Sequence, residues 1–264
     1  MQNQSEKIAW QEVGAPIKGA IIFLHAMAGS ATAWAPQMAA FKDAYRCIAW
    51  DMPGFGESQD AADDADMDVI VDTLASFVRN DLSLNSAHFV GLSVGGMILQ
   101  HFAAAHPDLV QSMTILDSSP KFAFGSDVDP SSFADPILTD LASGTTPAEF
   151  SNGMIRAIVG PSCSEDIKLD TIASMSRARA YGLALTTRLI ANHDALDKLG
   201  DITCPTLVMA GADDAETPPA YAHAIASRIV GAHVTIIPKA GHIVNLEAPD
   251  AVTARLQFFF DHAL

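Results

Sequence analysis

One serine in this chain lies where covalent catalysis would need it. Ser93 is the middle residue of Gly91-Leu92-Ser93-Val94-Gly95, which follows the apolar run 87–90 and opens the helix-like stretch 94–105. A sharp turn from strand to helix strains the backbone of its middle residue and exposes that hydroxyl above the sheet. The flanking glycines leave room for the adjacent strand and helix. The segment predicts a nucleophile, although the five letters alone also fit a glycine-rich turn with a capping serine.

A serine hydroxyl is a weak nucleophile at neutral pH until a base takes its proton. Nine histidines are present, and His242 alone combines a preceding glycine, a place just past the apolar run 233–237 and a position late in the chain. Active sites borne by parallel sheets gather at the carboxyl ends of the strands. We therefore expect His242 to be the general base for Ser93.

The imidazole needs a buried carboxylate that holds it in the right tautomer. Two adjacent aspartates, Asp213 and Asp214, follow a late apolar run, and neighbouring residues of a tight turn point in different directions. We expect Asp214 to face His242 and keep Asp213 as the alternative. Asp117, at the end of the run 112–116, is a third possibility, because the acid can also be delivered from that strand.

Acyl transfer also needs N–H donors aimed at the oxyanion of the tetrahedral intermediate. The first expected donor is the backbone N–H of Val94, directly after the nucleophile. The second is the N–H of Met27, in the loop that follows the apolar run 20–24. Backbone donors leave little trace in side-chain identity, so this assignment depends on the loop positions alone.

The elements that position these residues alternate between short apolar runs and helix-like stretches. Such alternation predicts βα units around a mostly parallel sheet whose strands are buried on both faces. The predicted strands are 20–24, 46–50, 87–90, 112–116, 206–210 and 233–237, and the predicted helices are 31–41, 67–82, 94–105, 219–230 and 248–262.

One long interval, from Asp117 to about Leu199, contains no strand-like run. It carries helical stretches separated by proline and glycine, and a structureless loop of this length is improbable in a compact domain. We expect residues 119–197 to form a helical cap inserted into a core made of residues 1–118 and 198–264.

The composition excludes several classes of partner. The formal net charge is −16, with 31 acidic and 15 basic residues, which disfavours nucleic acid and anionic membrane surfaces. Three widely spaced cysteines form neither a disulfide framework nor a C-x-x-C metal pair. No signal-peptide core is seen, so we expect a cytoplasmic protein. The proposed triad supplies both nucleophile and base, so we expect no metal and no cofactor.

Several segments together resemble the capped α/β-hydrolase superfamily. They are Leu24-His25-Ala26, residues 50–58 (WDMPGFGES), the serine turn, residues 211–218 (GADDAETP) and Gly241-His242. The resemblance implies an eight-stranded, mostly parallel sheet flanked by helices, and the chain order serine, aspartate, histidine. Within the superfamily the chain looks like the 3-oxoadipate enol-lactonase and small carboxylesterase branch, which implies hydrolysis of small esters or lactones through an acyl-enzyme.

Two positions depart from the family pattern. Ala26 stands where the family usually has glycine, and its methyl group is expected to crowd the oxyanion loop around Met27. Val94 stands where methionine or glutamine is common. Asp51 fits the turn after its strand and is expected to be structural.

The sequence says least about the substrate pocket. His25, Trp34, Met154, Arg156 and Tyr181 are the residues we expect to line it. C–C bond hydrolysis of ring-cleavage products by the same three residues is an alternative activity, and a non-catalytic ligand receptor on the same fold is another. The oligomeric state, monomer or dimer, stays open.

Four arginines concentrate positive charge in the expected cap of this acidic chain: Arg156, Arg177, Arg179 and Arg188. One of them could hold a substrate carboxylate, as an enol-lactone of a dicarboxylic acid would require. The other interpretation is that they form salt bridges on solvated helix faces.

Overall fold

The computed structural model describes residues 7–262, which contain a sheet in the strand order β1-β3-β2-β4-β5-β6-β7. β1 runs antiparallel to β3, and every other neighbouring pair is parallel. All six predicted strands lie in this sheet, so the mostly parallel α/β fold is confirmed. The strands are β1 (Trp10–Val13), β2 (Ala20–Leu24), β3 (Arg46–Trp50), β4 (Ala87–Leu92), β5 (Val110–Leu116), β6 (Thr206–Gly211) and β7 (His233–Ile237).

The number of strands differs from the family pattern. Residues 7–262 form seven strands, not the eight that the resemblance implied. In this range a single strand, β1, precedes β2, and it occupies the outer edge of the sheet beside β3. All four of its residues are exposed, as expected for a short strand at a sheet edge.

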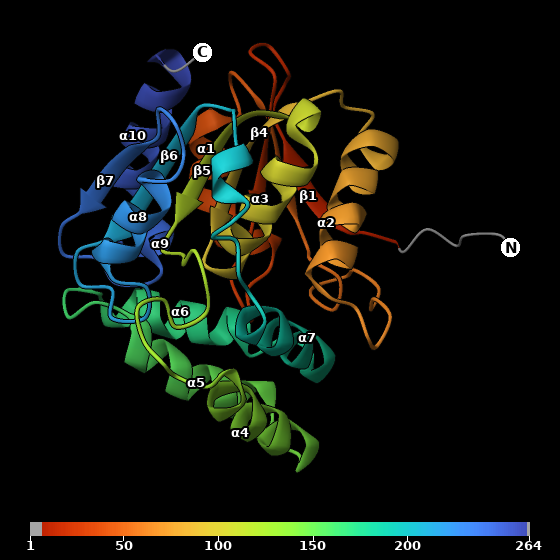
Figure 1. The fold of residues 1–264 in the computed structure, drawn as a ribbon, viewed down its shortest axis with the longest axis vertical. Coiled ribbons are helices and arrows are strands. Elements are labelled where there is room, and N and C mark those ends of the chain that lie inside the picture. The colour runs from red at the N-terminus through yellow and green to blue at the C-terminus, as the bar shows by residue number, and fades with distance from the viewer. Residues whose placement is uncertain (1–6, 263–264) are drawn as a thin grey trace, which may run out of the picture.

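Helices cover both faces of the sheet (Figure 1). α2 and α3 pack together on one face, and α1 and α10 pack together on the other. The helices of the core are α1 (Ala35–Phe41), α2 (Met67–Ser76), α3 (Val94–Ala105), α8 (Pro219–Ala226), α9 (Val244–Glu247) and α10 (Pro249–His262). Shorter turns of other helix types are η1 (Ala31–Trp34), η2 (Phe77–Asp81), η3 (Pro107–Leu109) and η4 (Leu199–Asp201).

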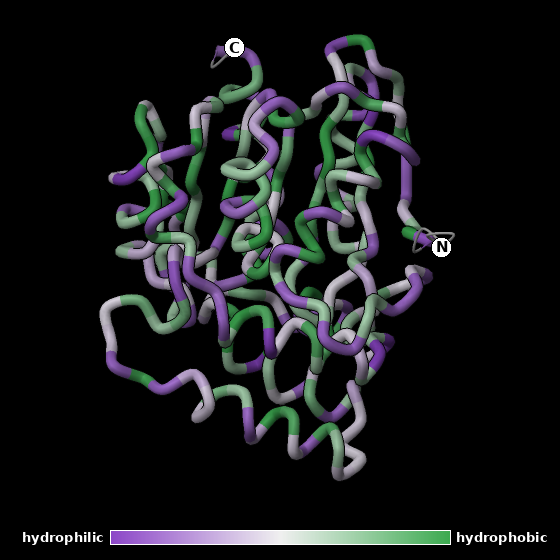
Figure 2. The backbone as a smooth tube through the Cα atoms, turned by 45° about the vertical axis from the view of Figure 1, so that its right-hand side comes forward, coloured by the Kyte–Doolittle hydropathy of each residue, from purple (hydrophilic) through white to green (hydrophobic). Residues whose placement is uncertain are grey.

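Three of the parallel strands are buried along their whole length, which explains why they are largely apolar. Every residue of β2, β4 and β6 is buried. Figure 2 shows these hydrophobic stretches running through the sheet, while colours alternate along the surrounding helices. Within residues 7–262, no helix has the length and apolar character that crossing a membrane requires.

Four further helices lie between β5 and β6 in the chain and gather at one end of the sheet (Figure 1). We call residues 119–197 the helical insertion, and these bounds enclose all four helices. Where the chain enters and leaves the insertion, Lys121 and Asp194 form an isolated β-bridge and an ion pair of 2.8 Å. The helices are α4 (Pro130–Ala142), α5 (Pro147–Ile158), α6 (Glu165–Met175) and α7 (Ala180–Ala191).

Candidate active site

Ser93 lies at the turn between β4 and α3 in a backbone conformation that non-glycine residues rarely adopt. Its φ is 54° and its ψ is −118°, and its N–H donates to the Leu116 carbonyl of β5 at 2.9 Å. A Cβ on Gly91 would lie 2.5 Å from the Gly95 carbonyl oxygen, and one on Gly95 would lie 2.5 Å from the Leu24 carbonyl oxygen. The glycines therefore allow the close approach that holds the serine in this turn.

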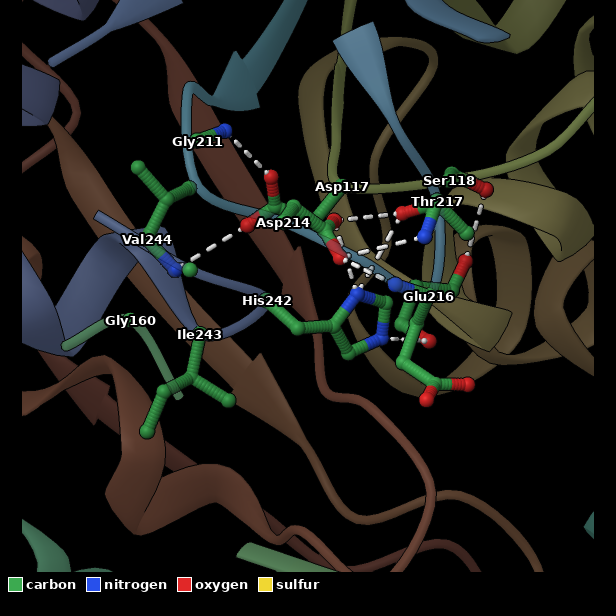
Figure 3. A network of polar contacts seen from close by, with 12 residues as sticks. Asp117, Ser118, Gly160, Gly211, Asp214, Glu216, Thr217, His242, Ile243 and Val244 are labelled. Atoms are coloured by element: carbon green, nitrogen blue, oxygen red, sulfur yellow. Dashed lines mark hydrogen bonds and ion pairs between the residues drawn. The ribbon is translucent and has the colours of Figure 1, made fainter. Parts of the chain in front are cut away.

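Ser93, His242 and Asp214 form one chain of hydrogen bonds, and Figure 3 shows the contact between His242 and Asp214. The His242 Nδ1 lies 2.9 Å from Asp214 Oδ2 and donates to this carboxylate, so Nε2 is left to accept from Ser93 Oγ at 3.0 Å. The three side chains are almost fully buried. The structure thus brings together the three residues that the sequence predicts as nucleophile, base and acid.

The Asp214 carboxylate is held by its own loop as well as by the imidazole. Its Oδ1 accepts the backbone N–H groups of Glu216, at 2.9 Å, and Thr217, at 3.1 Å. The Thr217 hydroxyl donates to Oδ2 at 2.7 Å. These donors fix the orientation of the carboxylate before any substrate is bound.

The charges around His242 stabilise the imidazolium that forms when it takes the proton of Ser93. Burial alone would lower the pKa of His242, but the hydrogen bond and the negative charge of Asp214, together with the charges of Asp117 and Glu216, raise it above its ordinary value. Burial opposes ionisation of Asp214, but the donors from His242 and Thr217 lower the pKa of its carboxyl.

The other two candidate acids lie differently. Asp213 is exposed, so its carboxylate has the solvation that a triad acid lacks. Asp117 is fully buried, but its Oδ1 accepts from the Gly211 N–H at 2.8 Å and its Oδ2 from the Val244 N–H at 3.0 Å. Burial raises the pKa of Asp117 to about 7. Its bonds join the end of β6 to the start of α9.

Of the two expected oxyanion donors, one follows Ser93 in the chain and the other belongs to a residue on the wall of the same cavity. Val94 is the first residue of α3, so its N–H has no acceptor within that helix. Met27 lines the same cavity as Ser93, in a loop whose left-handed residue is Ala28, with φ 60°. Ala26 is not among the residues with a positive φ, so the backbone of this loop does not require glycine at that position.

His25 does not line the cavity, contrary to the sequence-based expectation. It is buried; its Nδ1 donates to the Ala26 carbonyl at 2.8 Å, and its Nε2 accepts the Met52 N–H at 3.0 Å. Both ring nitrogens are therefore used to hold the oxyanion loop against the turn after β3. Its role is structural because no ring nitrogen is left for a substrate.

A cavity of about 540 Å³ lies above Ser93 and His242, between the core and the helical insertion. Residues from both parts line it: Ala26, Met27, Ser93, Met97, Ser119, Phe122, Ala123, Phe133, Ile137, Phe150, Met154, Ala157, Ile158, Met175, Ile190, Glu216, Thr217, Tyr221, His242 and Ile243. A volume of this order suits a small organic ligand.

Of the expected pocket residues, Met154 lines this cavity and Trp34, Arg156 and Tyr181 do not. Trp34 is fully buried beneath the sheet face, with its ring centroid 5.1 Å from that of Phe23. The other two are held elsewhere by polar contacts. Arg156 forms an exposed ion pair with Glu165 at 3.0 Å, and the Tyr181 hydroxyl donates to backbone carbonyls of residues 61 and 62.

The loop that carries His242 is joined directly to the helical insertion, a contact that the sequence analysis did not predict. The His242 N–H donates to the Ile158 carbonyl at the end of α5, at 3.0 Å. Glu247 Oε2 accepts the N–H groups of Gly160, at 2.9 Å, and Gly241, at 3.0 Å. Its Oε1 accepts the Ile243 N–H at 3.2 Å. The Glu247 carboxylate thereby binds the backbone on both sides of His242 and joins this loop to the insertion.

We expect Glu247→Gln to lower kcat for an ester about tenfold or more, with a smaller change in KM. The amide would place N–H groups opposite a backbone donor, so the loop that holds the imidazole shifts, and small displacements of a catalytic group cost rate steeply. Steady-state kinetics measures both constants.

The matched control is Asp250→Asn, which removes the same charge from an exposed position three residues further on. It should change kcat less than twofold. Equal effects of the two variants, or a Glu247→Gln effect confined to thermal stability, would show that Glu247 does not position His242.

Comparison with known proteins agrees with this geometry. The sequence profile described as "Alpha/beta hydrolase family" matches residues 21–255, and the chain belongs to that family. The expected resemblance to the α/β-hydrolase superfamily and its enol-lactonase branch is thereby confirmed, and the chain is a hydrolase of this family.

Three similar proteins illustrate the family. 3-Oxoadipate enol-lactonase 1 of Acinetobacter baylyi is 27% identical over 94% of this chain and 90% of its own. A pimeloyl-[acyl-carrier protein] methyl ester esterase of Chromobacterium violaceum is 31% identical over 73% of this chain and 74% of its own. A thermophilic esterase from Thermogutta terrifontis, solved with malate bound, has a TM-score of 0.88 at 25% identity and covers 97% of this chain and 93% of its own.

Three further residues of the site were not singled out from the sequence. Glu216 and Tyr221 line the cavity, and Thr217 holds the Asp214 carboxylate. The signal for Thr217 was present, because a hydroxyl three residues after an aspartate commonly bonds back to it. No local signal marks Glu216 or Tyr221, since their contact with the cavity depends on the position of the insertion.

Proposed function

We propose that the protein is a serine hydrolase that cleaves small carboxylic esters or lactones through an acyl-enzyme. The observation that carries the proposal is the buried hydrogen-bond chain from Asp214 through His242 to Ser93 at the base of a cavity. The names of the similar proteins, an enol-lactonase and esterases among them, support the same type of bond.

Each residue has a role in two acyl-transfer steps. Ser93 Oγ attacks the carbonyl carbon while His242 Nε2 takes its proton, and Asp214 holds the imidazole and stabilises the imidazolium. The oxyanion accepts from the N–H groups of Val94 and Met27, each worth about 3 kcal/mol in comparable sites. His242 then protonates the leaving alcohol, and in the second step it activates water to release the acid.

The helical insertion acts as a cap in this proposal. It supplies most of the apolar wall of the cavity and excludes water from the acyl chain, while its contact through Ile158 and Glu247 keeps the histidine loop in place. Exclusion of water strengthens the electrostatic contacts inside the site.

A labelled fluorophosphonate tests the proposal directly. We expect it to modify Ser93 in the folded protein, as located by peptide mass spectrometry, and to abolish turnover of p-nitrophenyl acetate and butyrate. Failure to label Ser93, together with absence of turnover, would favour a ligand receptor on the same fold. Loss of the yellow absorbance of ring-cleavage dienoates, without ester turnover, would favour C–C bond hydrolysis.

We further propose that the protein works in the cytoplasm. All three cysteines are free thiols in the structure, which suits a reducing compartment. Burial raises the pKa of each thiol, to about 12 for Cys47, so they are poor nucleophiles. Recovery of the protein from the medium or the periplasmic fraction of its cells would contradict this location.

A further inference from the structure

The wall of the cavity above Ser93, in the part of the chain that the structure describes, includes a glutamate but no lysine or arginine. Its wall is almost entirely apolar, formed by side chains such as Phe133, Phe150 and Met175 of the insertion. Among the described residues that line it, no lysine or arginine occurs. The acidic group on its wall is the carboxylate of Glu216.

The arginines of the helical insertion do not supply a cation to this cavity, because their guanidinium groups have other acceptors. Arg156 pairs with Glu165, and Arg177, in the turn after α6, donates to the Ala173 carbonyl of that helix. Arg179 donates to carbonyls of the turn after β3 and pairs with Asp60, and Arg188 donates to the Asp63 carbonyl. The sequence-based idea that one of them holds a substrate carboxylate therefore has no support in the structure.

Glu216 is built into the same turn as the triad acid. Its backbone N–H donates to Asp214, and its side chain lies beside the His242 imidazole (Figure 3). The carboxylate is solvent-exposed and its charge contributes to the raised pKa of His242, which places it within electrostatic reach of the reacting atoms. An anionic substrate group in the cavity would meet this charge.

An apolar acyl chain and one that ends in a carboxylate therefore differ in the free energy of transfer from water into the cavity. An apolar chain exchanges water for apolar wall, which is favourable for every methylene buried. A chain that ends in a carboxylate would lose its hydration, find no lysine or arginine among the described lining residues and be repelled by Glu216. The difference grows with the length of chain that enters the cavity.

We propose that Glu216 is a specificity-determining residue that rejects anionic substrates, so that the site takes neutral esters with apolar acyl chains of medium length. This inference rests on the proposed ester hydrolysis and adds the substrate class to it. The enol-lactones of dicarboxylic acids implied by the enol-lactonase resemblance are then poor substrates.

The test compares two p-nitrophenyl esters of equal chain length, the hexanoate and the hydrogen adipate. We expect wild-type kcat/KM to favour the hexanoate about 100-fold, and Glu216→Gln to reduce that preference about tenfold, because a like charge near the chain is removed. Asp213→Asn, which removes an exposed charge from the same turn outside the cavity, should leave the preference unchanged. Assays are run at the alkaline plateau of each variant, so that changes in His242 ionisation do not contribute.

The outcomes distinguish failure of the proposed role of Glu216 from failure of the proposed ester hydrolysis. Equal rates on the two esters, or an unchanged preference in Glu216→Gln, would overturn the role of Glu216 while leaving ester hydrolysis intact. Absence of Ser93-dependent turnover of either ester would instead overturn the proposed function. If the preference for the hexanoate over the hydrogen adipate fell as much in Asp213→Asn as in Glu216→Gln, it would depend on net charge alone. Glu216 would then have no specific role.

Discussion

Replacing Ser93 by alanine should lower kcat for p-nitrophenyl butyrate by a factor of about 10⁵, and replacing His242 in the same chain should cost almost nothing more. The nucleophile and its base act as one unit: without the hydroxyl the imidazole has no proton to take, and without the imidazole the hydroxyl stays a weak nucleophile. The 3.0 Å contact between Nε2 and Oγ is the structural reason to expect this coupling.

The measurement is a double-mutant cycle with Ser93→Ala, His242→Ala and the double variant, assayed under saturating ester. Ser227→Ala and His233→Ala are matched controls, because both side chains are exposed and neither residue lines the cavity. We expect both controls to stay within twofold of wild type. Additive losses in the double variant would mean that Ser93 and His242 act in separate steps, and full activity of Ser93→Ala would exclude the acyl-enzyme at Ser93.

The proximity of Ser93 and His242 was predictable because the position of each depends on local chain geometry. Ser93 lies between a buried strand and a helix, and His242 follows the last strand, so the ends of parallel strands bring them to the same edge. The choice between Asp213 and Asp214 needed the structure, because adjacent residues differ only in the direction of their side chains. The structure directs Asp214 inward by binding its carboxylate to two backbone N–H groups.

The cavity was predicted poorly for a physical reason. The helical spacing of Phe150, Met154 and Ile158 marks the apolar face of α5, but such a stripe does not tell whether the face meets the core, another helix or a cavity. Met154 lines the cavity wall, whereas Arg156, two residues later, faces Glu165 at the surface. Glu247 was missed because one of its three N–H donors, Gly160, lies 87 residues away in the chain, across the interface with the insertion.

Asp214→Asn should lower kcat about 10⁴-fold, and Asp117→Asn should lower it about tenfold or less. In the first variant the two backbone N–H groups of residues 216 and 217 require the amide oxygen at the Oδ1 position. The amide NH₂ then faces His242 Nδ1, which must accept instead of donate. The ring proton moves to Nε2, and that nitrogen can no longer accept from Ser93.

Asp117 acts on the imidazole through its charge rather than through a hydrogen bond, because both of its oxygens accept backbone N–H groups. In Asp117→Asn one of those donors meets an NH₂ group, which should destabilise the fold by about 1–3 kcal/mol. The tautomer of His242 is unchanged, so most of kcat is retained. Asp213→Asn serves as the control and should behave as wild type, since Asp213 is exposed.

The pH profile of kcat/KM tests independently whether Asp214 or Asp117 is the acid of the triad. His242 works as a base only when neutral, and Asp214 raises its pKa, so wild-type activity should fall as the pH drops through a value above the ordinary 6.5 of histidine. Removing either negative charge lowers that pKa and moves the acid limb to lower pH. Asp214 contributes a hydrogen bond as well as a charge, whereas Asp117 contributes a charge alone, so the limb should move further in Asp214→Asn than in Asp117→Asn. A larger loss of kcat and a larger shift in Asp117→Asn would instead make Asp117 the acid of the triad.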